Sequence, residues 1–206
     1  MILIGQYDSP FVRRVAIALT LYEISFDHQP LSVFQDGDQI RALNPLMRVP
    51  TLVLDDGFVL TDSHVMLDYL DTLVAAPMFP RAEPDRHRVL NVATLACGLA
   101  EKAVSLFYER RLHSETSKVW ETRCETQIGA VLARLEAIRA AQTTTFWFGS
   151  AITHADIAVA CALRFMGEAH PDVLLRNPHP AIAAYVAALE RMPVFQAINQ
   201  PFVAPA

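Results

Sequence analysis

The fold of this chain is decided by the stretch Asn44-Pro45-Leu46-Met47-Arg48-Val49-Pro50-Thr51-Leu52, followed shortly by Asp62-Ser63. A Val-Pro pair enters a short apolar strand, a hairpin follows, and the acidic-Ser pair begins a helix. If Pro50 is cis, as in about 5–6% of X-Pro bonds, the backbone N–H and C=O of Val49 turn outward and are free to pair with an extended ligand. Asp62 and Ser63 lie where a helix N-terminus attracts a carboxylate. The stretch indicates a peptide-binding cradle; the alternative is a trans proline followed by an ordinary N-cap.

A second cluster lies at the start of the chain. Ile2-Leu3-Ile4 is typical of a strand, and Tyr7-Asp8-Ser9-Pro10-Phe11 leads directly into an apolar helical pattern. Ser before Pro predicts an N-cap followed by a proline in the first helical position. A strand, a tight turn and a helix with a hydroxyl in its first turn form a place where a thiolate can be held. As an alternative, Ser9 is only a cap.

Together these segments resemble the glutathione transferase family, in its cytosolic, bacterial-type form with a serine-type active site. The motifs that carry the resemblance occur in the family's order and spacing along the whole chain: Ser9-Pro10-Phe11, Val49-Pro50, Asp62-Ser63 and Gly149-Ser150-Ala151-Ile152-Thr153-His154-Ala155-Asp156. The last resembles the family's capping motif, in which Thr153 and Asp156 close the start of a buried helix.

The resemblance implies an α/β plus all-α fold: a thioredoxin-like βαβαββα domain over residues 1–76, then a C-terminal helical bundle over 85–206. Three prolines between residues 77 and 84 cannot continue a helix and predict the linker. Asp56-Gly57 predicts a hairpin turn in a mixed four-stranded sheet. Periodicity predicts strands at 2–6, 26–30, 51–54 and 58–60, and helices at 10–22, near 36–43, 62–74, 86–107, about 120–138, 155–166 and 178–190.

The chemistry that the family performs requires an ionised thiol. A free thiol has a pKa near 8.5, and a hydrogen bond to sulfur at a helix N-terminus lowers it to about 3.5–7.5. By resemblance Ser9 is the catalytic donor, with Tyr7 as the alternative. No Cys adjoins Ser9, which argues against the family's thiol-disulfide branches.

The resemblance also assigns residues to glutathione binding. Val49, Asp62 and Ser63 form the cradle, Arg48 supplies a cation beside a carboxylate, and Phe11 packs on the thiol-bearing part of the ligand. Two departures from the family's pattern stand out. Met47 occupies a place that is often Gly, so this turn is made without a positive φ or Met47 bears the strain. Asp62 replaces a Glu or Gln, which shortens its reach by one methylene.

The function implied is a glutathione transferase that activates the thiol for attack on a small hydrophobic electrophile, with glutathione as co-substrate and no metal. The alternatives are a glutathione-dependent isomerase or dehalogenase on the same fold, or a non-catalytic interaction module. In the helical domain, Tyr108 and Arg111 are candidates to meet the electrophile. The family also implies a homodimer, for which Tyr69 and the Ala-rich segment 86–107 offer surface.

Composition limits the function further. The chain has 206 residues, is 52% hydrophobic and carries a net charge of −5 without a block of Lys or Arg, so disorder and direct nucleic-acid binding are not expected. No secretory segment or uninterrupted apolar run of bilayer length is recognised, so we expect no membrane partner and a cytoplasmic protein. The three cysteines are widely spaced, and we expect them to be reduced and buried.

Overall fold

The computed structural model describes residues 1–203, which divide into two compact units. One unit comprises Met1–Arg81 together with residues 192–203, and the other comprises Ala82–Arg191. The sequence prediction placed everything after residue 84 in the helical domain. The structure differs at the end of the chain, because the segment from Met192 forms hydrogen bonds to the first unit, from the Arg13 guanidinium to the carbonyls of Phe195 and Ile198.

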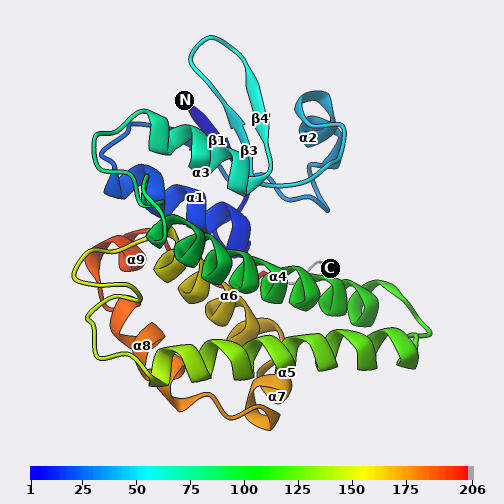
Figure 1. The fold of residues 1–206 in the computed structure, drawn as a ribbon. Coiled ribbons are helices and arrows are strands. Elements are labelled where there is room, and N and C mark those ends of the chain that lie inside the picture. The colour runs from blue at the N-terminus through cyan, green and yellow to red at the C-terminus, as the bar shows by residue number, and fades with distance from the viewer. Residues whose placement is uncertain (204–206) are drawn as a thin grey trace. The chain divides into compact units, whose positions relative to one another are not determined.

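The first unit is built on a mixed four-stranded sheet, as predicted, and the order of its strands is β2-β1-β3-β4. Figure 1 labels β1, β3 and β4 of this sheet. Its β1 pairs parallel with β2 and antiparallel with β3, and β3 pairs antiparallel with β4. The elements of this unit are β1 Ile2–Ile4, α1 Pro10–Leu21, β2 Asp27–Gln29, α2 Gly37–Leu43, β3 Thr51–Val53, β4 Val59–Thr61, α3 Ser63–Thr72 and α9 Pro193–Ala197.

Local sequence signals account for these elements. Ser9 caps α1, accepting the N–H of Val12, and Pro10 follows in the first helical position. The β3–β4 hairpin turns at Gly57, whose φ of 86° suits glycine and whose N–H donates to Leu54. Every residue of α1 from Val15 to Leu19 is fully buried, and the helix packs on α3. The thioredoxin-like arrangement predicted from the sequence is therefore confirmed.

The second unit is helical throughout its regular elements. These are α4 Asp85–Leu112, α5 Lys118–Ala140, α6 His154–Ala169, α7 Pro171–Arg176 and α8 Pro180–Leu189. The long helices α4 and α5 lie side by side, and α6 packs against α4 (Figure 1). Every residue of α6 from His154 to Leu163 is buried, which explains why that segment is apolar nearly all round.

The predicted capping motif is present at the start of α6. The Asp156 carboxylate accepts the Thr153 N–H at 2.6 Å and the Thr153 hydroxyl at 2.7 Å. Its other oxygen accepts the Trp147 N–H at 2.7 Å and the Tyr185 hydroxyl, so one fully buried carboxylate joins the preceding loop, α6 and α8. Each bond satisfies a polar group that burial would otherwise leave unpaired.

The short helices α7 and α9 were not predicted from the sequence. Each begins with a proline, Pro171 and Pro193, in its first helical position. In addition, α4 is long and apolar enough by length and composition to cross a membrane, with an 18-residue window of mean hydropathy 1.4. Half of that window is buried inside the protein, as in the core helix of a soluble domain, so this is weak evidence for a span. The three cysteines are buried and form no disulfide within the described chain, as expected.

Candidate functional site

Three segments of the first unit converge at one end of its sheet. Ile4 pairs with Thr51, and Thr51 pairs with Thr61. Because β1 and β4 end where β3 begins, the loop after β1, the loop before β3 and the start of α3 leave the sheet at the same edge. The approach is close: a Cβ placed on Gly5 would lie 2.7 Å from the Cβ of Val49. The predicted site residues 9, 49 and 63 therefore come from neighbouring segments.

The loop before β3 presents backbone that the sheet does not use. The Val49–Pro50 bond is cis, and no hydrogen bond to the N–H or C=O of Val49 exists among residues 1–203. The fully buried side chain of Asn44 holds this loop: its amide donates to the Arg48 carbonyl at 2.9 Å and to the Thr51 hydroxyl at 3.1 Å. The chain therefore offers one donor and one acceptor in a segment that Asn44 holds in place.

Met47 bears the strain that the sequence departure implied. Its φ is +52°, the left-handed region in which glycine is the usual residue. The Arg48 side chain is exposed beside it, while the Arg48 carbonyl accepts the Asn44 amide and the Thr51 hydroxyl. The role of Arg48 as a cation for a carboxylate stays a prediction.

Ser9 occupies the N-terminus of α1 with a hydroxyl that can act in two ways at once. One lone pair accepts the Val12 N–H at 3.4 Å, and within the described residues this hydroxyl donates to no group. A hydroxyl has one donor and two acceptor positions, so capping leaves its hydrogen available for a sulfur atom. Phe11, two residues on, is half-buried in the first turn of α1, and its predicted contact with a ligand is untested.

Tyr7, the alternative donor, is held between two other parts of the first unit. Its ring stacks on the His28 ring with centroids 3.8 Å apart, and its N–H donates to the Gln200 side chain at 3.0 Å. Burial raises the pKa of Tyr7 above its ordinary value, which keeps the phenol protonated. His28 in turn bonds the Gly5 carbonyl at 2.7 Å. These contacts make Tyr7 a structural part of the turn, whatever its hydroxyl does.

The start of α3 is arranged as the sequence predicted. Asp62 is the N-cap with a φ of 71°, and its carboxylate accepts the His64 N–H at 2.7 Å. Ser63 is buried in the first helical position, and its hydroxyl accepts from Arg14 at 3.2 Å. Arg14 was missed by sequence reasoning, since an arginine within an apolar helix gives no local signal of being 1% exposed. Its guanidinium places a positive charge behind the helix N-terminus.

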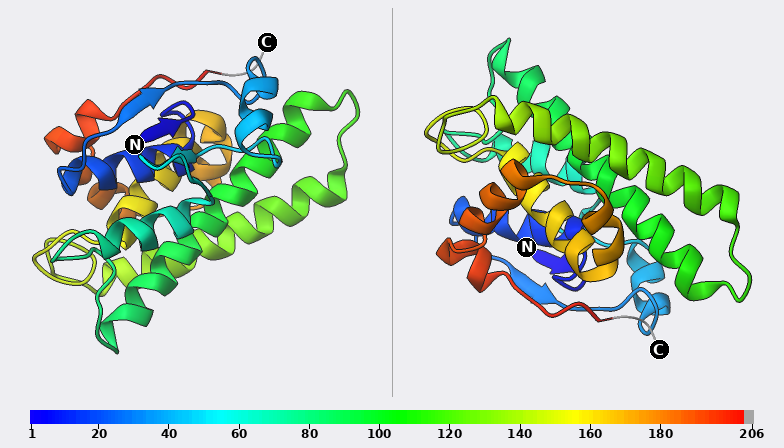
Figure 2. Two further views of the ribbon diagram at one scale, coloured as in Figure 1. Left: turned by 90° about the horizontal axis from the view of Figure 1, so that it is seen from above. Right: turned by 90° about the horizontal axis from the view of Figure 1, so that it is seen from below.

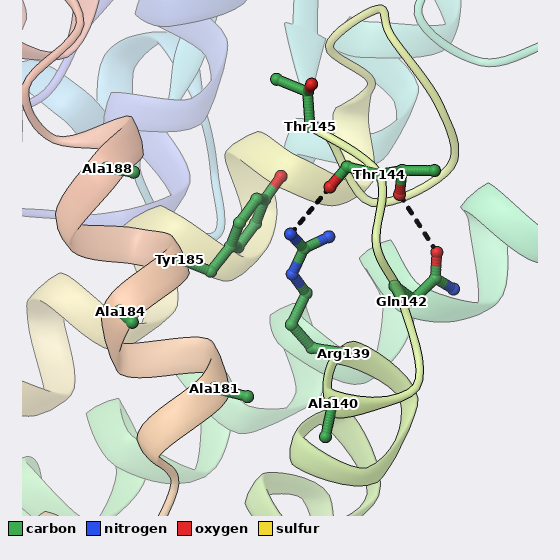
Figure 3. A pocket seen from close by; sticks show the side chains of 9 residues that line it. All are labelled: Arg139, Ala140, Gln142, Thr144, Thr145, Ala181, Ala184, Tyr185 and Ala188. Carbon is green, nitrogen blue, oxygen red and sulfur yellow. Dashed lines mark hydrogen bonds between the residues drawn. The ribbon is translucent and has the colours of Figure 1, made fainter.

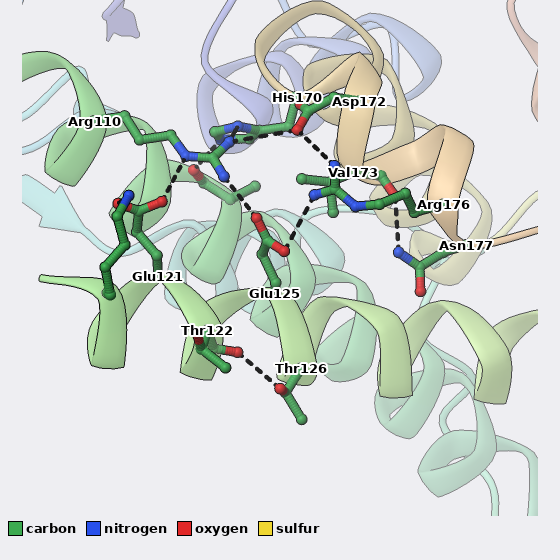
Figure 4. Close-up of polar contacts among 12 residues, drawn as sticks. Arg110, Glu121, Thr122, Glu125, Thr126, His170, Asp172, Val173, Arg176 and Asn177 are labelled. Atoms are coloured by element: carbon green, nitrogen blue, oxygen red, sulfur yellow. Dashed lines mark hydrogen bonds and ion pairs between the residues drawn. The ribbon is translucent and has the colours of Figure 1, made fainter. Parts of the chain in front are cut away.

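Charged side chains of the helical unit pair with charged side chains of neighbouring helices in the same unit. Arg110 on α4 pairs with Glu121 at 3.4 Å and Glu125 at 2.6 Å on α5, and with His170 at 3.4 Å (Figure 4). Arg176 on α7 completes the network through Glu125 at 3.1 Å. Tyr108 and Arg111, the candidates for meeting an electrophile, are exposed on α4 next to this network, and that role is untested.

A separate hollow of about 440 Å³ lies between α5, α8 and the loop that follows α5 (Figure 3). Arg139 lies at its edge, stacked 4.1 Å from the Tyr185 ring and donating to the Thr144 carbonyl. None of the predicted glutathione-binding residues lines this hollow. No group of three His, Cys, Asp or Glu side chains suited to a metal ion occurs in residues 1–203.

Comparison with known proteins agrees with this geometry. Residues 3–78 match the glutathione S-transferase N-terminal domain, and residues 118–188 match the C-terminal domain. A glutathione transferase family member from Pseudomonas fluorescens Pf-5, solved with bound glutathione, is 32% identical with a TM-score of 0.84, covering 98% of this chain and 99% of that one. The chain belongs to the glutathione S-transferase family.

Curated relatives include a protein described only as GST-like and a probable isomerase. The GST-like protein YibF of Escherichia coli (strain K12) is 29% identical over 87% of this chain and 89% of its own length. The probable maleylacetoacetate isomerase 2 of Drosophila melanogaster is 27% identical over 97% of this chain and 89% of its own length.

Proposed function

We propose that this chain is a glutathione transferase, which binds glutathione at the sheet edge formed by residues 9, 49 and 63 and transfers it to a small hydrophobic electrophile. The observation that carries the proposal is the unpaired backbone of Val49, in a loop that approaches Gly5 and α1, whose cap Ser9 keeps its hydroxyl hydrogen available. An extended peptide needs such a donor and acceptor, and its thiol needs such a hydroxyl. The related Pseudomonas structure with bound glutathione supports the same ligand.

The remaining cradle residues fit the charged ends of that peptide. Helix α3 begins at Ser63, so its first N–H groups and the positive end of its dipole can receive a carboxylate. Asp62 is exposed at the same point and can pair with the γ-glutamyl amine. Arg48 and Phe11 are proposed to contact a carboxylate and the cysteinyl portion.

Ser9 performs the activation in this proposal. Its hydroxyl donates to the sulfur and, with the N-terminus of α1, favours the thiolate over the thiol. The thiolate forms a bond to the electrophilic carbon, the electrons leave with the departing group, and the thiol proton goes to solvent.

A second candidate is glutathione-dependent isomerisation of a cis double bond, because the Drosophila relative named as a probable maleylacetoacetate isomerase covers nearly the whole chain. The same thiolate would add to the double bond, allow rotation about the resulting single bond, and leave again. Both reactions use Ser9 identically, so changing Ser9 does not distinguish them. Activity toward halide-bearing electrophiles, compared with activity toward maleyl-type substrates, does. Failure of the chain to bind immobilised glutathione would favour a non-catalytic interaction module and contradict both.

The binding proposal is tested with Ser63→Ala and calorimetry. We expect glutathione affinity to weaken by about 1–3 kcal/mol, the effect of leaving a charged partner without its hydrogen bond. Val65→Ala, on an exposed position of the same helical turn, is the matched control and should bind normally. Because Ser63 also accepts from Arg14, circular dichroism must show that the variant is folded. Unchanged affinity would mean that this helix start is only a cap.

The catalytic proposal is tested with Ser9→Ala and an ultraviolet titration of the bound thiolate. We expect the thiol pKa to rise toward its free value near 8.5 while glutathione affinity is nearly unchanged. A fall of about 1 kcal/mol in stability should accompany it, because the cap on Val12 is also lost. Equal thiol pKa values in the two proteins would transfer the role to Tyr7 or to backbone donors.

We also propose that the protein acts as a cytoplasmic homodimer. The support is family membership, together with exposed apolar side chains around the first unit's loops, such as Leu46 and Phe58. The segment 86–107 offers less apolar surface to a second copy than expected, because several of its side chains are already buried in the single chain: Val89, Val92, Ala93 and Ala96.

A further inference from the structure

The last segment of the chain lies against the turn that carries Ser9. Residues 198–203 run beside β2 in both views of Figure 2, within the same unit as α1. The segment lies outside the two domain matches, residues 3–78 and 118–188.

Arg13 anchors the segment to α1. The side chain is 2% exposed and donates through Nε to the Ile198 carbonyl and through a terminal nitrogen to the Phe195 carbonyl, both at 2.9 Å. Phe195 lies in the last turn of α9 and Ile198 is its C-cap, positions whose carbonyls lack intrahelical partners and near which a cation is favoured. The guanidinium carbon also lies 5.7 Å from the Phe195 ring centroid. Arg13 is the residue whose own N–H donates to the Ser9 carbonyl, so the anchor acts on the first turn of α1.

Beyond this anchor the segment holds the turn before Ser9. The turn closes when the Ser9 N–H donates to the Gln6 carbonyl at 3.2 Å, which leaves Tyr7 and Asp8 at its centre. The Tyr7 N–H donates to the Gln200 side-chain oxygen at 3.0 Å, and the Val203 N–H donates to the Asp8 carboxylate at 3.1 Å. Both central residues of the turn are therefore held by the C-terminal segment.

We infer that Gln200 and Arg13 are positioning residues for thiol activation, which fix the Ser9 hydroxyl by holding the turn 6–9 and the first turn of α1. This inference rests on the proposed function. Proximity is the physical reason, because a donor that moves by about 1 Å loses much of its effect on a bound group. The C-terminal segment thereby contributes to the acidity of a thiol it does not touch.

The inference is tested with Gln200→Ala, which removes the acceptor of the Tyr7 N–H. Gln200→Glu keeps an oxygen at that place, and Asn199→Ala changes the exposed neighbouring side chain as a control. Three quantities are measured: the thiol pKa of bound glutathione, the affinity for glutathione, and amide hydrogen exchange at Ser9 and Val12 in the ligand-free protein. The Ser9 and Val12 amides bond within the turn and not to the segment, so their exchange reports whether the turn itself loosens.

In Gln200→Ala we expect exchange at Ser9 and Val12 to be about fivefold faster, the effect of one lost hydrogen bond. If the ionisation equilibrium of the bound thiol changes by the same fivefold factor, the thiol pKa rises by about 0.7 unit. We expect the affinity for glutathione to stay within about twofold of the original. Gln200→Glu should keep the slow exchange at Ser9 and Val12, and Asn199→Ala should match the unaltered protein in all three quantities. A thiol pKa and exchange rates unchanged in Gln200→Ala overturn the inference, and so does an equal change in Asn199→Ala. If the unaltered protein does not lower the thiol pKa, the proposed function fails, and the exchange data alone decide whether the segment positions the turn.

Discussion

Gly5 lies close to both α1 and the loop before β3, and replacing it with Ala should severely destabilise the fold. Its φ is +124°, a region that residues with a Cβ rarely adopt. A Cβ there would lie 2.6 Å from Val12 Cγ2 and 2.7 Å from Val49 Cβ. Neither neighbour can move away without a large cost in free energy. Val12 is fully buried in α1, and the Val49 atom in contact is the Cβ, which is bonded directly to the backbone. Overpacking of about 1–3 kcal/mol and a backbone term of about 1–2 kcal/mol give a combined loss of about 2–5 kcal/mol.

Two other glycines separate the terms of this prediction. Gly57 has a φ of +86° with nothing within 4 Å of a Cβ, so Gly57→Ala should show the backbone term alone. Gly98 lies within α4 with equally open space, and Gly98→Ala should stabilise by about 0.5–1 kcal/mol. Urea unfolding is followed by circular dichroism, because both tryptophans, at 120 and 147, lie in the helical unit and report poorly on Gly5. A Gly5→Ala protein no less stable than Gly57→Ala would refute the reasoning.

Three further predictions concern other regions. Met47→Gly should leave the stability in thermal melts unchanged or raise it by up to about 1 kcal/mol. The reason is that relief of the strained left-handed conformation outweighs the greater conformational freedom of glycine in the unfolded chain. A clear loss of stability would contradict this. Burial lowers the pKa of His170, so as pH falls below about 6.5 the unfolded chain takes up a proton that the folded chain resists, and stability declines until the folded pKa is passed. His170→Gln should flatten that part of the stability–pH curve. Light scattering at micromolar concentration should give about twice the chain mass, and a 22.9 kDa species alone would contradict the homodimer.

Features specified by neighbouring residues could be predicted from the sequence. The Ser9 cap, the Asp56-Gly57 hairpin and the Thr153–Asp156 cap all depend on residues within a few positions of one another. The convergence of the three site segments followed from family resemblance, and the strand register accounts for it. The functional roles assigned to these residues stay predictions.

Contacts between distant residues could not be predicted. Arg14 reaches a hydroxyl 49 positions away, and Arg13 reaches a carbonyl 185 positions away, although both look like surface residues of an amphipathic helix. Asn44 belongs to the stretch that indicated the cradle, but its role in holding the loop depends on the folded path of residues 46–51. Periodicity describes which face of a helix is apolar and does not reveal which charged side chain will be enclosed by another segment.

The bond between Arg13 and Ile198 has a consequence for synthesis of the protein on the ribosome. At about 5–20 residues per second, the 185 residues between these partners take roughly 10–40 s to be made. Throughout that interval the nascent N-terminal segment lacks the carbonyls that its buried guanidinium binds. The part of the protein that emerges first is therefore completed last, and a fragment ending at Arg81 would lack part of its own interior.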